Sequence, residues 1–337
     1  MAAATDFRAL ERANRRETAV LVVAMIALLA TLGFGLDVWA GSIRIAQGSL
    51  SGFPVLTIFA LIFGGVQAVI SFFGGAQLVL LSVHARPLTP DSIQHQRVLD
   101  AINEMAIAAR MPPPRAYLMD DPAPNAFATG RDPAHSVICV TQGLIDTMDR
   151  EELQGVIGHE MSHIRDYDIR TMMMVAVMVG GIAMLGDFFF RMMFYSGTGG
   201  GGRRTSNERN DGGGALILIY VATLILAAVA PIIAQLVAMA ISRQREYLAD
   251  ASSVEFTRNP HALLRALEQI AKSESPLKAG TSGTGHLFIV NPREGLREDR
   301  ERFLDNLLST HPPLNKRIAR LQAMLGATGG VTAVPQS

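Results

Sequence analysis

The stretch His159-Glu160-Met161-Ser162-His163 carries two imidazoles four residues apart and a carboxylate directly after the first. In an α-helix, residues four apart leave the same face one turn apart, so both rings can reach one metal ion. Glu160 then lies beside that ion without binding it. This H-E-x-x-H pattern predicts a catalytic zinc site in which His159 and His163 are ligands and Glu160 takes a proton from the attacking water.

The residues on either side of this stretch predict that it is helical. Asp149 can cap the start of the helix, and Glu152 stands at the reciprocal position of a capping box. Leu153, Ile157 and Ile164 recur at helical spacing and form an apolar stripe. The alternative is a surface helix that carries two histidines by chance, so the prediction depends on a third ligand elsewhere in the chain.

The spacing of other residues limits where that third ligand can be. A metzincin site is excluded, because Asp166 and Ile169 stand where that class needs glycine and histidine. A thermolysin-like site takes a glutamate from a second helix, and residues 242–250 offer Glu246 with Asp250 on the same face. We expect Glu246 to be the third ligand and Asp250 to orient a ligand histidine through its other ring nitrogen. The alternative is a charged, solvated helix face.

Four separated motifs occur between about Thr89 and Leu325: Pro124–Gly130, Glu152–His163, Arg243–Asp250, and Ser309–Pro313 with Arg317. In these motifs and their order the chain resembles the HtpX-type membrane metalloproteases, a family related to the CAAX prenyl proteases. The resemblance implies a zinc-dependent endopeptidase with one Zn²⁺ per chain, acting on misfolded or membrane proteins in stress-related quality control. It also implies that His159, His163 and Glu246 bind the zinc and that Glu160 is the general base.

The resemblance implies two further groups of site residues. The strand at Asn125 and Ala126 would border the cleft and pair with an extended substrate backbone. The alternative is an ordinary edge strand. His311 or Arg317 would approach the active centre and stabilise a developing oxyanion. The alternative there is a turn set by the following prolines, with a histidine that is hydrogen-bonded for structural reasons.

The composition indicates a membrane protein. Hydrophobic residues make up 49% of the 337 residues and charged residues only 18%, and the mean hydropathy is +0.25. A helix needs about 20 apolar residues to cross the hydrocarbon core, and four runs are candidates: residues 19–36, 53–83, 172–190 and 215–241. The third run contains Asp187, and Pro231 can kink the fourth. For these two runs, a buried core helix is the alternative.

The arginines predict the orientation in the membrane. Arg8, Arg12, Arg15 and Arg16 precede the first span, whereas only Arg44 lies in the connection after it, so the N-terminus should face the cytoplasm of a bacterial inner membrane. Two crossings then return the H-E-x-x-H motif to the cytoplasmic side, and a second hairpin returns Glu246 there. The arginines between residues 191 and 209 weigh against a complete second crossing, because they would lie in the far-side loop.

We therefore expect a mainly α membrane protein with four transmembrane helices and a zincin-like α+β catalytic domain assembled from two segments. In the first catalytic segment, the patterns predict a helix over 91–110 and strands over 115–119, 125–129 and 136–141. The expected organisation is an N-terminal transmembrane hairpin over 1–84, a first catalytic segment over 85–170, a second hairpin with a flexible glycine-rich loop over 171–241, a second catalytic segment over 242–325, and a disordered tail over 326–337.

Two other function classes are alternatives. An intramembrane-cleaving protease would bury the motif in an apolar span, but charged residues flank it at Glu151, Glu152, Arg165 and Asp166. A non-catalytic membrane scaffold would have no metal site or a structural one. A structural site needs four protein ligands, often cysteines, and Cys139 is the single cysteine. The net charge of +0 and the absence of a basic motif predict no nucleic-acid partner. The oligomeric state cannot be deduced from the sequence.

Overall fold

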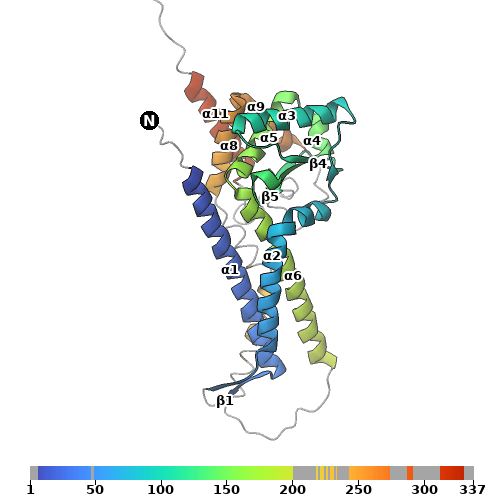
Figure 1. Cartoon of the computed structure of the whole chain (residues 1–337), viewed down its shortest axis with the longest axis vertical. Coiled ribbons are helices and arrows are strands. Elements are labelled where there is room, and N and C mark those ends of the chain that lie inside the picture. The colour runs from blue at the N-terminus through green and yellow to red at the C-terminus, as the bar shows by residue number, and fades with distance from the viewer. Residues whose placement is uncertain are drawn as a thin grey trace, which may run out of the picture.

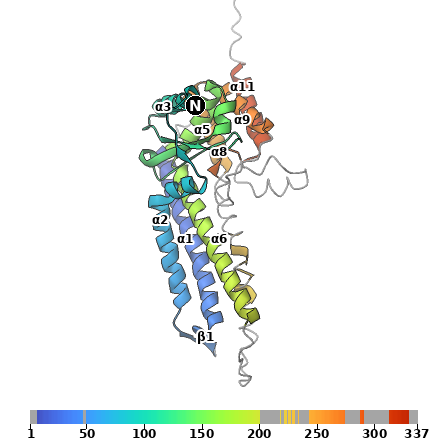
Figure 2. The same ribbon diagram turned by 90° about the vertical axis from the view of Figure 1, so that its right-hand side faces the viewer.

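The part of the chain that the structure describes has two regions, a helical stem and an α+β head (Figure 1). The structure is a computed structural model that describes residues 7–46, 49–199, 243–273, 287–290 and 312–329, together with a few helical positions between 218 and 233. Both views show the long stem helices side by side, with the head at one end and the strand β1 at the other (Figures 1 and 2).

The stem contains three long helices that pack against one another. Each includes a segment long and apolar enough to cross a membrane, namely Asn14–Ala40, Val55–Ser82 and Asp168–Phe188. A two-stranded hairpin connects the first two helices. The stem elements are α1 (Phe7–Ala40), β1 (Ile43–Ala46), β2 (Ser49–Gly52), α2 (Val55–Ser82) and α6 (Asp168–Gly199).

The third span differs from the prediction. It belongs to α6, which begins at Asp168, so the predicted domain boundary between residues 170 and 171 falls inside a continuous helix. The helix continues through the charged residues at 168 and 170, because these charges have partners. The Arg170 Nε, for example, donates to the carbonyl of Arg131 at 2.6 Å. The fourth predicted span, 215–241, and the glycine-rich loop lie mostly outside the described residues.

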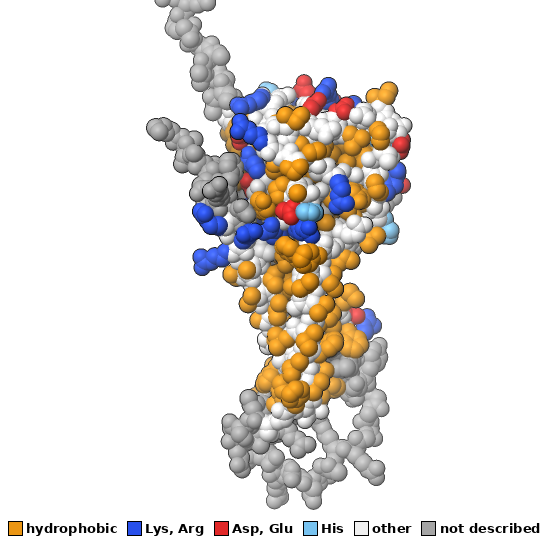
Figure 3. All heavy atoms as spheres, viewed as in Figure 1, with side chains coloured by type: hydrophobic (Ala, Val, Ile, Leu, Met, Phe, Trp, Pro, Cys, Tyr) orange, Lys and Arg blue, Asp and Glu red, His pale blue; other side chains and the backbone are white. Residues whose placement is uncertain are grey.

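The surface of the stem is apolar, as a lipid-facing surface must be (Figure 3). Large hydrophobic side chains point outward along all three helices, including Val23 (65% exposed), Phe73 (69%) and Met184 (76%). Asp37 is the charged residue of the apolar part of α1 that follows Glu17, and it is fully buried. Its carboxylate accepts hydrogen bonds from the backbone N–H groups of Leu56 at 2.9 Å and of Thr57 at 2.8 Å, which satisfies the first turn of α2.

The head combines a four-stranded mixed sheet with six helices of the described chain. The strand order is β3-β4-β6-β5, in which β4 and β6 are parallel and the other pairs are antiparallel. The elements are β3 (Arg86–Pro87), α3 (Ile93–Ala109), β4 (Arg115–Met119), β5 (Ala126–Gly130), β6 (Ser136–Thr141), α4 (Gln142–Thr147), α5 (Arg150–Arg165), α8 (Arg243–Thr257), α9 (Pro260–Lys272) and α11 (Leu314–Gly329).

The predicted elements of the head are found with small shifts. The strands β4 and β6 coincide with the predicted ranges, β5 is displaced by one residue, and α3 lies within the predicted helix. Helix α11 continues to Gly329, past Leu325, where we had placed the end of the second catalytic segment. Residues 330–337 of the predicted tail lie outside the described residues.

The sheet joins the head to the stem. Successive side chains of a strand point to opposite faces, and here both faces are buried. Ala126 and Ile138 pack in the core formed with α3, α5 and α9. Phe127, Val137 and Cys139 pack instead against the ends of the stem helices. The catalytic head is therefore continuous with the membrane helices through one sheet and is not carried on a linker.

Candidate metal centre

Helix α5 carries the H-E-x-x-H motif, and its start is capped as the sequence predicted. The Asp149 carboxylate accepts a hydrogen bond from the backbone N–H of Glu152 at 2.8 Å, while the Glu152 carboxylate accepts one from the N–H of Asp149 at 2.9 Å. Such a reciprocal cap contributes about 1 kcal/mol to helix stability. It sets where α5 begins and so which face the two histidines present.

Helix α8 lies directly against α5 because small residues face it. A side chain at Gly158 would meet the Cα of Ser253 at 3.4 Å, and the Ser253 hydroxyl donates to the carbonyl of Gly155 at 2.6 Å. At the other end of this contact, the guanidinium of Arg165 donates to the hydroxyl of Ser252 at 2.8 Å. These contacts bring together two helices that the second hairpin separates in sequence.

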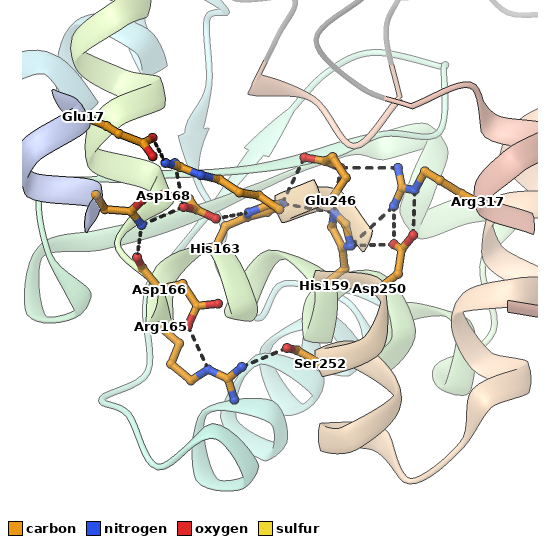
Figure 4. A network of polar contacts seen from close by, with 12 residues as sticks. Glu17, His159, His163, Arg165, Asp166, Asp168, Glu246, Asp250, Ser252 and Arg317 are labelled. Atoms are coloured by element: carbon orange, nitrogen blue, oxygen red, sulfur yellow. Dashed lines mark hydrogen bonds and ion pairs between the residues drawn. The ribbon is translucent and has the colours of Figure 1, made fainter. Parts of the chain in front are cut away.

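Three potential ligands converge between α5 and α8, as Figure 4 shows. The Nε2 atoms of His159 and His163 are 3.2 Å apart. The Glu246 carboxylate oxygens lie 3.6 Å from His159 Nε2 and 3.5 Å from His163 Nε2. All three ligand atoms lie within 4.8 Å of one another, and all three residues are buried. The structure thus brings the residues predicted as zinc ligands together.

The chemistry of the donor set fits a cation. His159 Nδ1 is 3.0 Å from an Asp250 oxygen, and His163 Nδ1 is 3.1 Å from an Asp168 oxygen. An ionised carboxylate can only accept, so each Nδ1 must carry the proton of its ring. In the neutral rings both Nε2 atoms then hold lone pairs, and these face each other and the Glu246 carboxylate. Acceptors this close need a positive charge between them.

The electrostatics of His163 lead to the same conclusion. Burial lowers the pKa of His163, but the hydrogen bond that His163 donates to Asp168 and the charge of Glu246 outweigh burial and raise that pKa to about 9. Without a metal, the centre would therefore hold a proton at neutral pH. A pocket that attracts a proton this strongly also attracts a metal cation, and the two compete for the same ring nitrogen.

Asp250 is held by Arg317, which comes from α11. The guanidinium donates to both Asp250 oxygens, at 2.7 and 3.1 Å, and to the carbonyl of Ile289 at 2.8 Å. Burial raises the pKa of Asp250, but the charge of Arg317 and the hydrogen bond to His159 outweigh it and lower that pKa to about 2. Arg317 therefore lies in the centre, as expected from the resemblance. Its guanidinium donates to Asp250 and Ile289, and its Nη2 lies 3.4 Å from His159 Nδ1.

Asp168 is a residue of the centre that the sequence analysis missed. It is the first residue of α6, and while one of its oxygens meets His163, the other accepts hydrogen bonds from the side chains of Asn14 and Arg245, each at 2.9 Å. Arg245 also pairs with Glu17 of α1. The support of His163 therefore extends into the first membrane helix.

Only the local backbone distinguishes Asp168 from its neighbour Asp166. Both acids follow the motif, and an acid five residues after the second histidine is the only signal in the sequence. Tyr167 between them adopts a left-handed conformation with φ of 62°, which ends α5 and turns the chain. As a result Asp168 meets His163, whereas the Asp166 carboxylate meets Arg165 at 3.3 Å.

The other predicted site residues are placed as follows. Glu160 is buried on α5 beside the two histidines and is not part of the three-residue cluster. The carbonyl of Ala126 accepts a hydrogen bond from the N–H of Ile289 at 2.9 Å, and the Asn125 amide donates to the carbonyl of Val290 at 2.9 Å. This edge of β5 is thus covered by residues 287–290. His311 lies outside the described residues.

Comparisons with known proteins identify the family of the chain. Residues 92–325 match peptidase family M48. The chain is 37% identical over 320 residues to a protease HtpX homolog of Dictyoglomus thermophilum, with 95% of each protein covered. It is 42% identical over 235 residues to a protease HtpX homolog of Dictyoglomus turgidum, which covers 70% of this chain and 71% of that protein. A crystal structure of S. mikatae Ste24p aligns with a TM-score of 0.46 and 17% identity, over 93% of this chain and 66% of that one.

The match to the family spans most of the chain and includes all three converging residues, His159, His163 and Glu246. The stem supplies helices long enough to cross a membrane, and the head supplies a cluster suited to a metal. The chain belongs to peptidase family M48, among its HtpX-type members, and is a membrane-bound metalloprotease.

Proposed function

We propose that this protease is a zinc endopeptidase that cleaves misfolded or membrane proteins at the cytoplasmic face of the inner membrane. The observation that carries the proposal is the convergence of His159, His163 and Glu246, with the remaining nitrogen of each ring held by a carboxylate. A centre prepared in this way orients its ligands before the metal arrives.

The donor set favours zinc, with one ion per chain. Two imidazoles and one carboxylate are the ligands of thermolysin-like zinc sites, and three protein ligands leave a fourth position open for water or substrate. A closed structural site would need a fourth protein ligand. Cys139, the single cysteine, is buried in the sheet core and is not part of the cluster. The proposed site is therefore catalytic.

Different residues of the chain would have different roles in the reaction. When bound, zinc supplies Lewis-acid polarisation of the scissile carbonyl and of the attacking water. Glu160 accepts the proton of that water on its carboxylate and passes it to the nitrogen of the leaving amine. Asp250 and Asp168 keep the rings of His159 and His163 in the required tautomer. The chain thus provides both the proton transfer and the orientation of the ligands.

For the other residues that the resemblance implied, the contacts in the structure change the roles that we propose. Arg317 acts mainly by fixing Asp250, because its guanidinium donates two hydrogen bonds to that carboxylate. The distance of 3.7 Å between Arg317 and Glu246 leaves it near the reacting groups, so a share in oxyanion stabilisation stays a prediction. Asn125 and Ala126 would bind the substrate backbone only after residues 287–290 leave this edge of β5. The role of His311 also stays a prediction.

The location of the centre supports substrates at the membrane. Asp168 contacts His163 and is also the first residue of a candidate membrane span, so the reacting groups lie close to where the stem enters the bilayer. An intramembrane-cleaving enzyme is the second candidate, but none of the three described spans contains the H-E-x-x-H motif. We therefore propose that the scissile bond is cleaved at the membrane surface.

Replacement of the general base tests the mechanism. Glu160→Gln keeps the size of the side chain but removes its basicity, so proteolysis of casein by the detergent-purified chain should fall by at least about a hundredfold. Zinc content, measured by elemental analysis, should remain at one per chain. Glu151→Gln on the same helix is the matched control, because Glu151 is exposed and distant from the cluster. Normal turnover by the Glu160 variant, or loss of its zinc, would contradict the assigned role.

The arginines of α1 support the cytoplasmic placement of the head. Arg12, Arg15 and Arg16 are exposed at the head end of α1, and Lys and Arg side chains gather where the stem meets the head (Figure 3). Arg191 is one of the arginines that weigh against a complete second crossing. Its Nε is paired with the carboxylate of Asp187 on the same helix at 2.8 Å. The other arginines of the far-side loop lie outside the described residues.

Thiol labelling of intact cells tests this orientation. Ser49→Cys lies in β2 at the far end of the stem, and Gln94→Cys is exposed on α3 of the head. The native Cys139 is buried, and burial raises the pKa of its thiol, so it should give little background. An impermeant reagent should label position 49 in intact cells and position 94 only after permeabilisation. Labelling of position 94 in intact cells would place the head outside.

A further inference from the structure

Asn14 lies in the first membrane helix, far in sequence from the residues that match the protease family. It is 7% exposed, although the residues that follow it in the helix, Arg15, Arg16 and Glu17, are exposed. Its amide nitrogen donates a hydrogen bond to Asp168 at 2.9 Å and another to the backbone carbonyl of Asp166. Both donors of one amide are therefore used at the junction of α5 and α6.

This junction is the least relaxed part of the backbone near the metal centre. Tyr167 has a φ of 62°, and a left-handed conformation costs a non-glycine residue about 1–2 kcal/mol. The Asn14 amide donates to the backbone carbonyl of Asp166, directly before Tyr167, and to the carboxylate of Asp168, directly after it. Asn14 therefore holds in place the turn that positions the Asp168 carboxylate beside His163.

The two oxygens of Asp168 divide their contacts between the stem and the metal centre. One oxygen lies 3.1 Å from His163 Nδ1. The other accepts from Asn14 and from Arg245, so the carboxylate is fixed from both sides. Without Asn14, one of the two hydrogen bonds that hold the outer oxygen is lost, and the carboxylate can rotate away from the ring.

We propose that Asn14 is a positioning residue of the metal centre, so that the first membrane helix completes the site that the protease segment carries. The inference rests on the proposed function, because it needs His163 to be a metal ligand. Groups that orient a ligand histidine typically change metal affinity by about 10- to 100-fold. We expect a loss in this range when Asn14 loses its two donors.

The test uses the detergent-purified full chain with Co²⁺ as the metal probe, with affinity measured by chelator competition and geometry by the visible absorption spectrum. Asn14→Leu keeps the side-chain volume and removes both donors, and it should weaken Co²⁺ binding about 10- to 100-fold and alter the spectrum. Asn14→Asp places an acceptor against Asp168 and should weaken binding at least as much. An unchanged affinity and spectrum in both variants would overturn the proposal.

Two controls separate positioning from simple packing. Thr18→Val removes a 2.6 Å contact with Thr171 between the same two helices without touching Asp168, so it should leave affinity and spectrum nearly unchanged. In an Asp168→Asn background, Asn14→Leu should cause little further loss, because both changes act through one carboxylate. Fully additive losses, or an equal effect of Thr18→Val, would show a general packing role and overturn the proposal.

The same experiment distinguishes this inference from the function on which it rests. If the wild-type chain bound no Co²⁺, or if His163→Ala bound it normally, the proposed metal centre would be wrong and the inference with it. If the wild type binds Co²⁺ with His163 required, and the Asn14 variants bind equally well, only the inference fails. Thermal unfolding of each variant, recorded without metal, identifies losses caused by misfolding, and Asn14→Ala then replaces any variant that does not fold.

Discussion

The two histidines that we propose as ligands are supported by different regions of the molecule. His159 is held by Asp250 and Arg317, which we call the head arm, and all of it lies within the residues that match the protease family. His163 is held by Asp168, and we call Asp168 with its partners Asn14, Arg245 and Glu17 the stem arm. The head arm is a property of the protease segment, whereas the stem arm depends on the membrane helices.

The two arms also differ in their exposure to solvent. Arg317 is 1% exposed, and its contact with Asp250 is a buried, bidentate ion pair. The stem arm instead ends at Glu17, whose side chain is 52% exposed. A buried pair loses much when one partner is removed, while an exposed pair contributes little. We therefore expect the head arm to affect stability and the stem arm to affect mainly the metal.

The largest effect is expected at Glu246, whose carboxylate lies beside both histidines. Glu246→Ala removes the third ligand, so the loss of zinc affinity should exceed the roughly 100-fold upper limit for a group that only orients a ligand. Dialysis followed by elemental analysis measures it. Glu255→Ala on the same helix is the matched control, because that side chain is 62% exposed. A Glu246 variant that kept its zinc as firmly as wild type would show that the third ligand is a different residue.

The arms themselves are compared by replacing their carboxylates. Asp250→Asn and Asp168→Asn should each lower metal affinity about 10- to 100-fold. Asp250→Asn should in addition destabilise the fold by about 3 kcal/mol, because it leaves the buried charge of Arg317 without its carboxylate. Thermal unfolding of the metal-free variants measures the difference. Equal destabilisation by the two changes would remove the distinction between the arms.

The pH dependence of the metal affinity tests the stem arm. In the metal-free protein the pKa of His163 is raised to about 9 from 6.5, so its contribution to stability is complete below pH 6.5 and is lost as the pH rises through 9. Metal must displace this proton, so affinity should rise about tenfold per pH unit up to about pH 9. Chelator competition across pH 6.5–10 measures this slope. In Asp168→Asn the slope should end at a lower pH, and an unchanged profile would argue against the stem arm.

The smallest effect is expected at the exposed end of the stem arm. Glu17→Gln removes the charge that pairs with Arg245, and an exposed ion pair contributes about 1 kcal/mol or less, which corresponds to at most about a fivefold change in metal affinity. The same Co²⁺ competition assay measures it. A loss as large as that of Asp168→Asn would mean that Arg245, and not Asn14, is the main support of Asp168.

Local patterns predicted much of the head and most of the centre. The capping box at Asp149 and Glu152 depends on residues three apart, and the strands β4 and β6 are short runs separated by turns rich in Asp, Pro and Gly. The pairing of His159 with His163 follows from the period of one helix. Such features are visible in the sequence because the interacting groups are close along the chain.

The contacts of the two arms could be predicted only in part. Asp250 was expected because it lies four residues after Glu246, on the same face of α8. Asp168 was not expected, because the turn at Tyr167 decides that it, and not Asp166, meets His163. Asn14 was not expected, because its contact with Asp168 depends on how α1 packs against that turn. The edge of β5, expected to be open, is covered by residues 287–290 for the same reason.

The sequence by itself therefore determined which groups the centre contains: two imidazoles and the proposed general base on one helix, a carboxylate on another, and apolar runs suited to a membrane. Helical periodicity and hydropathy encode these features locally. The tertiary structure alone decided which acid supports His163 and that the first membrane helix reaches it through Asn14. Asn14 and Asp168 are 154 positions apart, and their contact depends on helix packing. Asp168 is only five positions from His163, but the left-handed turn at Tyr167 decides that it, and not Asp166, meets the ring, which no local pattern records.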